Sequence, residues 1–369
     1  MNSLVPNSCA ECIVYSQCGG TGLPALDKMG CIPSGKPHPK DPNMDPRLSD
    51  EFWKKWDDVG GLLDMGCHTT IKGMSAEVLP RYIPKIHDGV SRNGLLKNVP
   101  WVAIPLHQLF ISKKGNFRGC NFKSRAELED YFRISANTKI VLVGCDQDRH
   151  IENFWKNHLK YALPASLKLL NIDLVTCPNY SLFTDMTGFH VLRNIKRIIL
   201  TAERFSNAGI PPVLHLNAFR DQHWDTWARF LMEHPEITIV AKEFQTGSNE
   251  KEIKSLADLQ QILGKAIHPI LIGAARFHNT AKALFPSFSI MDSKPFMAAT
   301  HREALVYDNK GLLKWKKTLL LNGMSIEGIL ADNIKLYPQY MERIQKSSRP
   351  PKPPKIDRRI PDEQELSFA

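Results

Sequence analysis

The feature that most constrains the fold is a step of apolar strand, polar loop and long helical pattern that recurs along the chain. Its fullest instance spans residues 172–193, where an apolar run breaks at Pro178 and polar side chains precede a helical pattern. In the expected strand at residues 139–144, the four residues from Ile140 to Val143 are apolar without interruption, which is typical of a strand covered on both faces in a parallel sheet. The repeated step predicts eight strands, at residues 59–66, 101–106, 139–144, 172–177, 212–217, 237–243, 268–273 and 287–291.

Helical patterns follow seven of the expected strands. Ser124 and Glu127 have the spacing of a capping box, which predicts a helix start. Eight strand–helix steps over roughly 250 residues indicate a (β/α)8 barrel of TIM type, which we place at residues 52–300. A doubly wound open sheet is the alternative, but the chain has no G-x-G-x-x-G turn. The helices are expected at residues 75–87, from 124 onward, and at 150–170, 187–208, 221–233, 255–267 and just after 278.

A separate element is expected at residues 1–45, where four of the eight cysteines cluster among glycines and prolines. The segment has too few apolar residues to fold alone, and four thiolates around one ion would supply the missing stabilisation. The sequence therefore predicts a metal-binding knuckle occupied by zinc, with an iron–sulfur cluster as the alternative. The expected ligands are Cys9, Cys12, Cys18 and Cys31.

The pattern changes after the last expected strand. Three helices are predicted within residues 301–345, at about 301–307, 311–322 and 325–344, closing the barrel or packing beneath it. Residues 346–369 are rich in proline and basic side chains, which indicates a disordered or polyproline-type tail. Such a tail is a possible docking surface for a protein partner.

The charge balance favours an anionic partner. The formal net charge is +10, and nucleic acid or a nucleotide is the commonest ligand of so basic a chain. No apolar run approaches the roughly 20 residues of a membrane span, and the first residues have no signal-peptide pattern. We therefore expect a protein of the cytoplasm without a membrane partner.

In a barrel, chemistry sits at the carboxyl ends of the strands. Polar residues at those positions include His68, His107, Asp146 and Asp148 as well as the candidates below. Glu243 and Asp292 carry the most weight, because neither shows an obvious helix start directly after it that the carboxylate would cap. The candidate catalytic residues are Asp64, Asn179, Asp185, Asn217, Glu243, Asp292 and Lys294.

One stretch resembles a known family. Residues 172–245 carry a proline–amide–aromatic–serine step, an Asp-Met, an Asn-x-x-Arg and an Asn-Ala-Gly-Ile-Pro, beginning at Pro178, Asp185, Asn194 and Asn207. This order resembles an uncharacterised family, a domain of unknown function, found in phages and mobile elements of bacteria. The chain departs from that pattern at Asn179, where the family has an acid, and at Thr187, where it has proline. The resemblance implies that Asn179, Ser181 and Asp185 are positioned together.

A second similarity concerns architecture alone. A basic barrel with a cysteine-bound metal and carboxylates at the strand ends is similar in plan to the tRNA-guanine transglycosylases, in which an aspartate attacks the glycosidic carbon. The chain lacks their Asp-Ser-Gly-Gly motif, and its cysteines precede the barrel instead of following it.

Three functional hypotheses follow from these patterns. The first is an enzyme acting on nucleic acid or a nucleotide, with barrel carboxylates as nucleophile or general base in glycosidic-bond or base-exchange chemistry. The second is a non-catalytic module that binds nucleic acid or protein. The third is a metal-dependent hydrolase with His68, His107 and aspartates as ligands.

Overall fold

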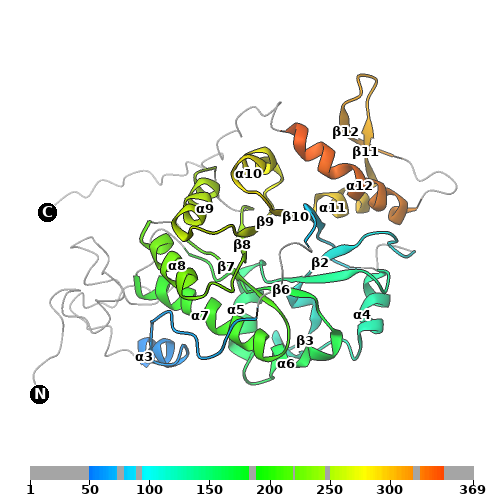
Figure 1. Cartoon of the computed structure of the whole chain (residues 1–369). Coiled ribbons are helices and arrows are strands. Elements are labelled where there is room, and N and C mark those ends of the chain that lie inside the picture. The colour runs from blue at the N-terminus through cyan, green and yellow to red at the C-terminus, as the bar shows by residue number, and fades with distance from the viewer. Residues whose placement is uncertain are drawn as a thin grey trace, which may run out of the picture.

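The central feature of the fold is one sheet of eight parallel strands (Figure 1). The computed structural model describes residues 50–72, 79–88, 94–182, 188–218, 221–245, 250–318 and 325–344. The strands are β1 (Tyr82–Pro84), β2 (Trp101–Pro105), β5 (Lys139–Val143), β6 (Leu174–Thr176), β7 (Pro212–His215), β8 (Ile239–Glu243), β9 (His268–Ile272) and β10 (Ser289–Asp292). From β2 to β10, neighbouring strands of the sheet are also consecutive parallel strands in the chain, and the first strand pairs with the last, as in a barrel and unlike a doubly wound sheet.

The sheet curls until its two ends nearly meet. β1 pairs with β10 over three residues, and Lys85, directly after β1, forms one parallel bridge to Ala103 of β2. The backbone N–H of Ile86 donates to the carbonyl of Ala103 at 2.9 Å. The result is a nearly closed parallel barrel, compatible with the TIM type that the sequence predicts. Seven of the eight expected strands coincide with observed ones.

Side chains from alternate strand positions fill the inside of the barrel. Because successive residues of a strand point to opposite faces, one apolar set faces inward and a second faces the surrounding helices. The inward set forms a cluster of its own, and each of the eight strands contributes to it. Its buried members are Ile83, Trp101, Ala103, Val141, Val143, Cys145, Leu174, Val213, Ile239, Ala241, Ile270, Ile272 and Met291.

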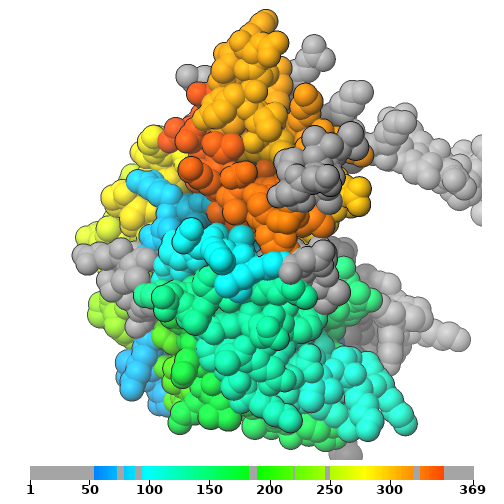
Figure 2. All heavy atoms as spheres, turned by 90° about the vertical axis from the view of Figure 1, so that its right-hand side faces the viewer, coloured from blue at the N-terminus to red at the C-terminus, as the bar shows by residue number. Residues whose placement is uncertain are grey.

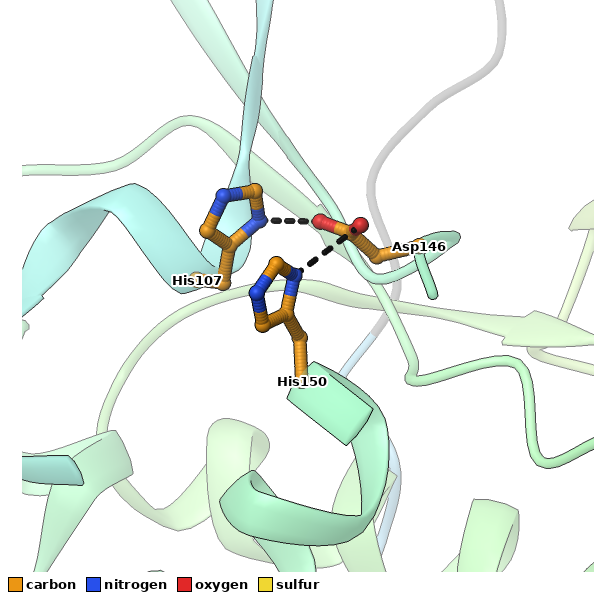
Figure 3. Close-up of side chains that lie close together, drawn as sticks. All are labelled: His107, Asp146 and His150. Atoms are coloured by element: carbon orange, nitrogen blue, oxygen red, sulfur yellow. Dashed lines mark hydrogen bonds and ion pairs between the residues drawn. The ribbon is translucent and has the colours of Figure 1, made fainter. Parts of the chain in front are cut away.

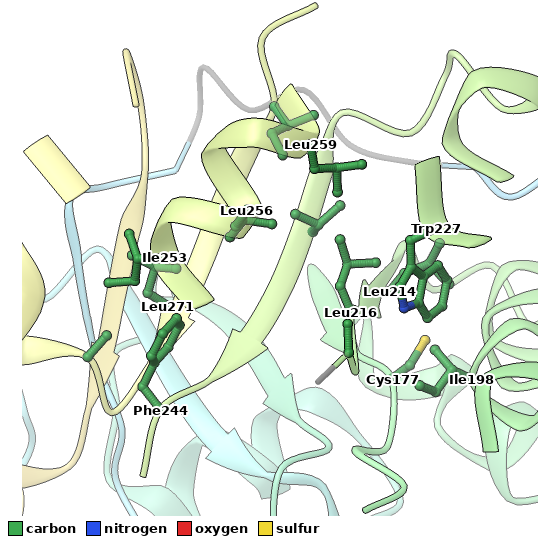
Figure 4. Packing of buried hydrophobic residues seen from close by; sticks show 14 of the residues in the cluster. Cys177, Ile198, Leu214, Leu216, Trp227, Phe244, Ile253, Leu256, Leu259 and Leu271 are labelled. Atoms are coloured by element: carbon green, nitrogen blue, oxygen red, sulfur yellow. The ribbon is translucent and has the colours of Figure 1, made fainter. Parts of the chain in front are cut away.

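Helices cover the outside of the strands. Trp227, Ile253, Leu256 and Leu259 of α8 and α9 pack against Leu271 and the other outward-facing residues of the sheet (Figure 4). The burial of these large apolar side chains, at about 25 cal/mol per Å², holds the helices on the sheet. The helices between the strands are α5 (Asp148–Asn157), α6 (Leu163–Ser166), η5 (Lys168–Leu170), α7 (Gly188–Asn207), α8 (Asp221–Glu233), α9 (Glu250–Leu263), η6 (Ala275–Phe277) and α10 (His278–Leu284).

The prediction for the first strand is wrong. Residues 59–66 form turns, with Gly60 and Gly61 at φ +87° and +72°, which a strand does not allow. The first strand is instead β1, inside the span expected to be a helix at 75–87. Pro84 is compatible with a strand end but would break a helix. In front of these turns lies α3 (Asp50–Asp57), where the Lys55 carbonyl accepts a bond from Arg193 of α7 at 3.2 Å.

The connection between β2 and β5 contains η4 (Leu106–Leu109), a hairpin of β3 (Phe110–Lys113) and β4 (Asn116–Cys120), and α4 (Arg125–Phe132). The predicted capping box at the start of α4 is confirmed. The Ser124 hydroxyl accepts from the N–H of Glu127 at 3.2 Å, and the Glu127 carboxylate accepts from the N–H of Lys123 at 2.7 Å.

The region after β10 differs from the prediction of three helices. It contains α11 (Lys294–Thr300), an antiparallel hairpin of β11 (Glu303–Tyr307) and β12 (Leu313–Lys317), and α12 (Ile326–Ile344). The helices expected at 301–307 and 311–322 are therefore wrong, while the last is confirmed. The hairpin forms because alternate residues Leu305 and Trp315 pair on the face toward α12, and because Gly311 supplies φ +69° in the turn.

Several predictions fall outside the described residues. These are the cysteine knuckle, the tail at 346–369 and Asp185. Among the helices that the structure describes, none is long and apolar enough to cross a membrane.

Candidate functional site

Two histidines and an aspartate converge at the carboxyl end of two neighbouring strands (Figure 3). His107 lies in η4, directly after β2, and Asp146 lies in the loop after β5. His150 follows in the first turn of α5, four residues after Asp146. Because β2 and β5 pair in parallel over five residues, their following loops start side by side. The barrel topology therefore brings His107 to a loop that lies some forty residues further along the chain.

Both imidazoles face the same carboxylate. Nδ1 of His107 contacts Oδ2 of Asp146, and Nδ1 of His150 lies 3.1 Å from Oδ1. The two rings stack with centroids 4.1 Å apart and an angle of 21° between their planes. One potential ligand atom from each residue lies within 4.8 Å of the others.

The carboxylate of Asp146 is held in its charged form. Burial raises its pKa, but the hydrogen bond and charge of His107 lower it, and so do bonds from the Gln147 N–H and from His150. The net result is a pKa well below the usual range for aspartate. Asp146 is therefore an anion at every pH at which the protein is expected to work.

The cluster lies at the edge of a small, largely apolar pocket. The side chains of His107, His150 and Asp146 are 25%, 22% and 17% exposed, so solvent reaches all three. Apolar walls lower the local dielectric and so strengthen electrostatic interactions with a bound group. The remaining lining residues are Leu106, Phe110, Phe117, Val143, Gly144, Ile151, Phe154 and Pro178.

Gly144 sets the position of the loop that carries Asp146. A Cβ atom at Gly144 would lie 2.5 Å from the carbonyl oxygen of Thr176 and 2.6 Å from the carbonyl carbon of Cys177. The N–H of Gly144 donates to the Thr176 hydroxyl at 2.9 Å, and its carbonyl accepts from Asn179 at 3.0 Å. Only glycine allows this approach between the ends of β5 and β6.

Two interpretations of the cluster are open on chemical grounds. In one, Asp146 is a structural group that orders the start of α5, because Oδ1 also accepts from the N–H of Gln147 at 2.7 Å. In the other, the three side chains are metal ligands. Imidazole nitrogens and a carboxylate oxygen are ligands of zinc and iron(II), in sites that leave positions open for water.

Glu243, Asn179 and Gln245 lie near a thiol at the inner end of the barrel. Cys145 is buried, and its Sγ lies 3.8 Å from Nδ2 of Asn179 and 3.9 Å from Oε1 of Gln245. Burial raises the pKa of Cys145 to about 12, and the charge of Glu243 adds to the shift while that of Lys85 opposes it. Cys145 is therefore a neutral thiol at physiological pH.

The arguments for Glu243 and Asp292 need correction. Asp292 does stand before a helix, because α11 starts at Lys294, whose N–H donates to Oδ1 of Asp292 at 2.7 Å. Glu243 likewise accepts from the backbone N–H of Gln245. Both are the last residues of their strands, β10 and β8, as expected. Burial raises the pKa of Asp292. A catalytic role for either carboxylate stays a prediction.

The remaining candidates do not join the His–Asp cluster. Asp64 lies among turns instead of at a strand end, and forms an ion pair with the buried Lys196 of α7 at 2.6 Å. Asn217 is buried and bonds the carbonyl of Tyr180 at 2.6 Å. Lys294 lies over the ring of Trp315, with 5.1 Å between its Nζ and the ring centroid. His68, the other expected histidine ligand, is exposed, and its N–H donates to Glu203.

Part of the stretch that resembles the phage family forms a buried network beside the barrel. The guanidinium of Arg197 lies 3.8 Å from the ring centroid of Tyr180, bonds Asn194 at 3.1 Å and pairs with Glu152. Asn194 in turn donates to the carbonyl of Ser181 at 2.9 Å. These residues fix the chain after β6, which is a structural role.

The sequence pattern missed His150. Its signal is present in the chain: an aspartate directly after a buried strand, followed four residues later by a histidine in the first helical turn. That spacing puts both side chains on one face of the helix start.

The comparisons with known proteins give no family for this chain. No protein-family model matches it, and no curated protein matches it either. The resemblance to the phage and mobile-element family therefore stays a prediction, and the function is argued from the site alone.

Proposed function

We propose that the chain is a metal-dependent hydrolase whose metal ligands are His107, Asp146 and His150. The observation that supports it is the convergence of three ligand atoms within 4.8 Å at the carboxyl end of a parallel barrel. This is the third of the hypotheses drawn from the sequence, with His150 in place of His68. The carboxyl end is where barrel enzymes hold their active sites.

The donor set suits a catalytic ion. Metal–ligand distances of about 2.1 Å require donor atoms roughly 3–3.5 Å apart, so small side-chain shifts would complete the site. Three protein ligands leave at least one position for water, and a bound divalent ion lowers the pKa of that water to about 7. The ionised Asp146 would offset part of the metal charge, and the apolar lining would limit competing solvent.

The net charge of +10 indicates the kind of substrate. A basic protein attracts polyanions, so we propose a phosphate ester, such as a nucleotide or nucleic acid, as the substrate class. This keeps the partner expected from the sequence. The transglycosylase-like chemistry at Glu243 and Asp292 is the weaker candidate, because both carboxylates already bind backbone N–H groups.

Metal binding by the full-length protein tests the proposal. After removal of metal, cobalt(II) is added to the wild type and to His150→Ala. We expect the wild type to bind one more equivalent of cobalt(II) than the variant does. This additional cobalt should show no thiolate-to-metal charge-transfer band, because only cysteine ligands produce that band. Any metal at Cys9, Cys12, Cys18 and Cys31 would remain.

His234→Ala is the matched control, because His234 also pairs with a carboxylate, that of Glu236, at 3.1 Å. It should bind as much metal as the wild type. Equal metal content in the wild type and His150→Ala, at equal affinity, would show that the cluster is structural.

A second candidate function is nucleic-acid binding through the β11–β12 hairpin. The hairpin stands out from the body of the molecule in both views (Figures 1 and 2). Its exposed side chains combine Lys314, Lys316 and Lys317 with Tyr307 and Val306. Lysines that contact phosphates, together with an aromatic ring for base stacking, are features of nucleic-acid-binding surfaces.

A further inference from the structure

Lys85 is a buried residue whose ammonium forms no ion pair within the part of the chain that the structure describes. The residue is 6% exposed, and the charge of its ammonium acts on Asp292 and Cys145 without a hydrogen bond to either. The other lysines buried to this degree differ. Lys242 pairs with Glu252 at 2.7 Å, and Lys196 pairs with Asp64 at 2.6 Å. Lysine is rarely buried without a paired carboxylate, so the position of Lys85 indicates a function.

Lys85 lies on the inner side of the barrel end. It directly follows β1, and Ile83, two residues earlier, belongs to the inward-facing cluster. Alternation along the strand therefore directs Lys85 inward as well. Its backbone is held on both sides, since its N–H donates to the carbonyl of Asp292 at 2.9 Å and it bridges to Ala103 of β2.

The ammonium and the His–Asp cluster share one end of three consecutive strands. Lys85 follows β1, His107 follows β2, and Asp146 follows β5. With strands about 4.8 Å apart, two strand spacings amount to about 10 Å, which one phosphate ester can span. His87 interacts electrostatically with both Lys85 and Asp146. Burial lowers the pKa of His87, the charge of Lys85 lowers it further, and the charge of Asp146 raises it.

We infer that Lys85 binds a phosphoryl group of the substrate, beside the metal ligands of the proposed hydrolase. This inference rests on the proposed function and adds to it the group that recognises the substrate. An anion supplied by the substrate would give this ammonium a direct ion-pair partner, which no carboxylate of the described residues provides. The charge of Lys85 lowers the pKa of Asp292, but the two side chains form no ion pair, and the Asp292 carboxylate accepts instead from the N–H of Lys294 at 2.7 Å and from the side chain of Tyr337.

Inorganic phosphate is the probe, used with the full-length metal-loaded protein. We expect phosphate to raise the melting temperature of the wild type and acetate at the same ionic strength to leave it unchanged. Lys85→Met should bind phosphate at least about tenfold more weakly, the effect of losing one charge-assisted hydrogen bond. Lys85→Arg keeps the charge and should retain most of the affinity.

A comparison of two buried lysines separates a binding role from a structural one. Without phosphate, Lys85→Met should melt close to the wild-type temperature, because the substitution breaks no ion pair among the described residues. Lys242→Met should melt lower, because it breaks the ion pair with Glu252.

Each contrary outcome is decisive. If Lys85→Met binds phosphate as the wild type does, or if the wild type shows no response to phosphate, the inference is wrong. A melting temperature for Lys85→Met as low as that of Lys242→Met would make Lys85 structural. These outcomes leave the hydrolase proposal standing, since that is judged by the metal lost in His150→Ala.

Discussion

His107 and His150 stack their imidazole rings 4.1 Å apart while each directs Nδ1 at the carboxylate of Asp146. The pair joins the end of β2 to the start of α5, and so ties two consecutive barrel strands at the face where barrel enzymes work. Stacking fixes the ring planes, and the shared carboxylate fixes the rotation of each ring. The arrangement is therefore organised before any ligand binds, as an efficient metal site requires.

Replacing the shared carboxylate should destabilise the protein in a pH-dependent way. Asp146→Asn should lower the unfolding free energy of the metal-free protein by about 2 kcal/mol at pH 7, because hydrogen bonds to a charged acceptor are lost. The folded-state pKa of Asp146 lies below its unfolded value, so this stability is present above about pH 4 and is lost as the pH falls further. Chemical denaturation from pH 7 to 3 measures it.

The difference between wild type and Asp146→Asn should thus shrink toward acid pH. Asp225→Asn, an exposed position on α8, is the control and should change stability little at any pH. A difference that stays constant down to pH 3 would contradict the assignment.

Three buried histidines predict a steep loss of stability in mild acid. Burial, together with nearby cations, lowers the pKa of His215 to about 3 and those of His158 and His268 to about 4. Below about pH 6.5 the unfolded chain therefore binds more protons than the folded protein does. The unfolding free energy then decreases by about 1.4 kcal/mol for each histidine with every unit by which the pH is lowered. The three together give about 4 kcal/mol per unit between pH 6 and 5.

Unfolding free energies measured from pH 8 to 5 check this slope. His215→Gln should remove about one third of it, whatever the variant costs at pH 8. A flat profile would mean that these imidazoles are protonated in the folded protein.

The β11–β12 hairpin should contribute to the salt dependence of nucleic-acid binding. The double change Lys316→Ala and Lys317→Ala should weaken binding to duplex DNA at low salt and reduce the slope of log K against log salt by up to about 2, since each lost phosphate contact contributes about 0.9. Fluorescence anisotropy at several salt concentrations measures both effects.

The control for the hairpin removes two exposed lysines elsewhere, Lys254 of α9 and Lys282 of α10. If both double variants lose the same affinity, binding depends on net charge and the hairpin has no special part.

Gly144→Ala should damage both stability and the site. The added methyl group would overlap the Thr176 carbonyl and push the end of β5 away from β6, at a cost of about 1–3 kcal/mol. Because Asp146 lies two residues further on, metal affinity should fall as well. Gly328→Ala on α12 is the matched control: its nearest atom is 3.6 Å away, and alanine should stabilise the helix by about 1 kcal/mol. Thermal unfolding compares the two.

Much of the barrel could be predicted from the chain because its strands are buried on both faces. Runs such as residues 140–143 are apolar without interruption. β1 could not be predicted, because it has only three residues and its neighbours include prolines, so its sequence shows no hydrophobic periodicity. The β11–β12 hairpin could not be predicted either. Leu305, Leu313 and Trp315 bury one of its faces against α12, and this contact depends on tertiary structure.

The site could be predicted only in part for a similar reason. Sequence placed His107 and Asp146 at strand ends, and the chain order of the strands brings those ends together. That the two side chains meet, and that His150 joins them, depends on rotamers and on the geometry of the first turn of α5. The burial of Lys85 without an ion pair in the described part of the chain depends on the closure of the barrel, which no local pattern records.

The closure itself has a dynamic consequence. β2 pairs with β5, and β8 with β9, over five residues each, whereas β1 meets β2 at the one bridge between Lys85 and Ala103. A seam held by so few bonds opens at a lower free energy than the rest of a sheet. The amide of Ile86, bonded across this seam, should exchange with deuterium sooner than amides inside β5. Transient separation of β1 from β2, with β1 still paired to β10, would open a path to the inner end of the barrel, where the ammonium of Lys85 lies.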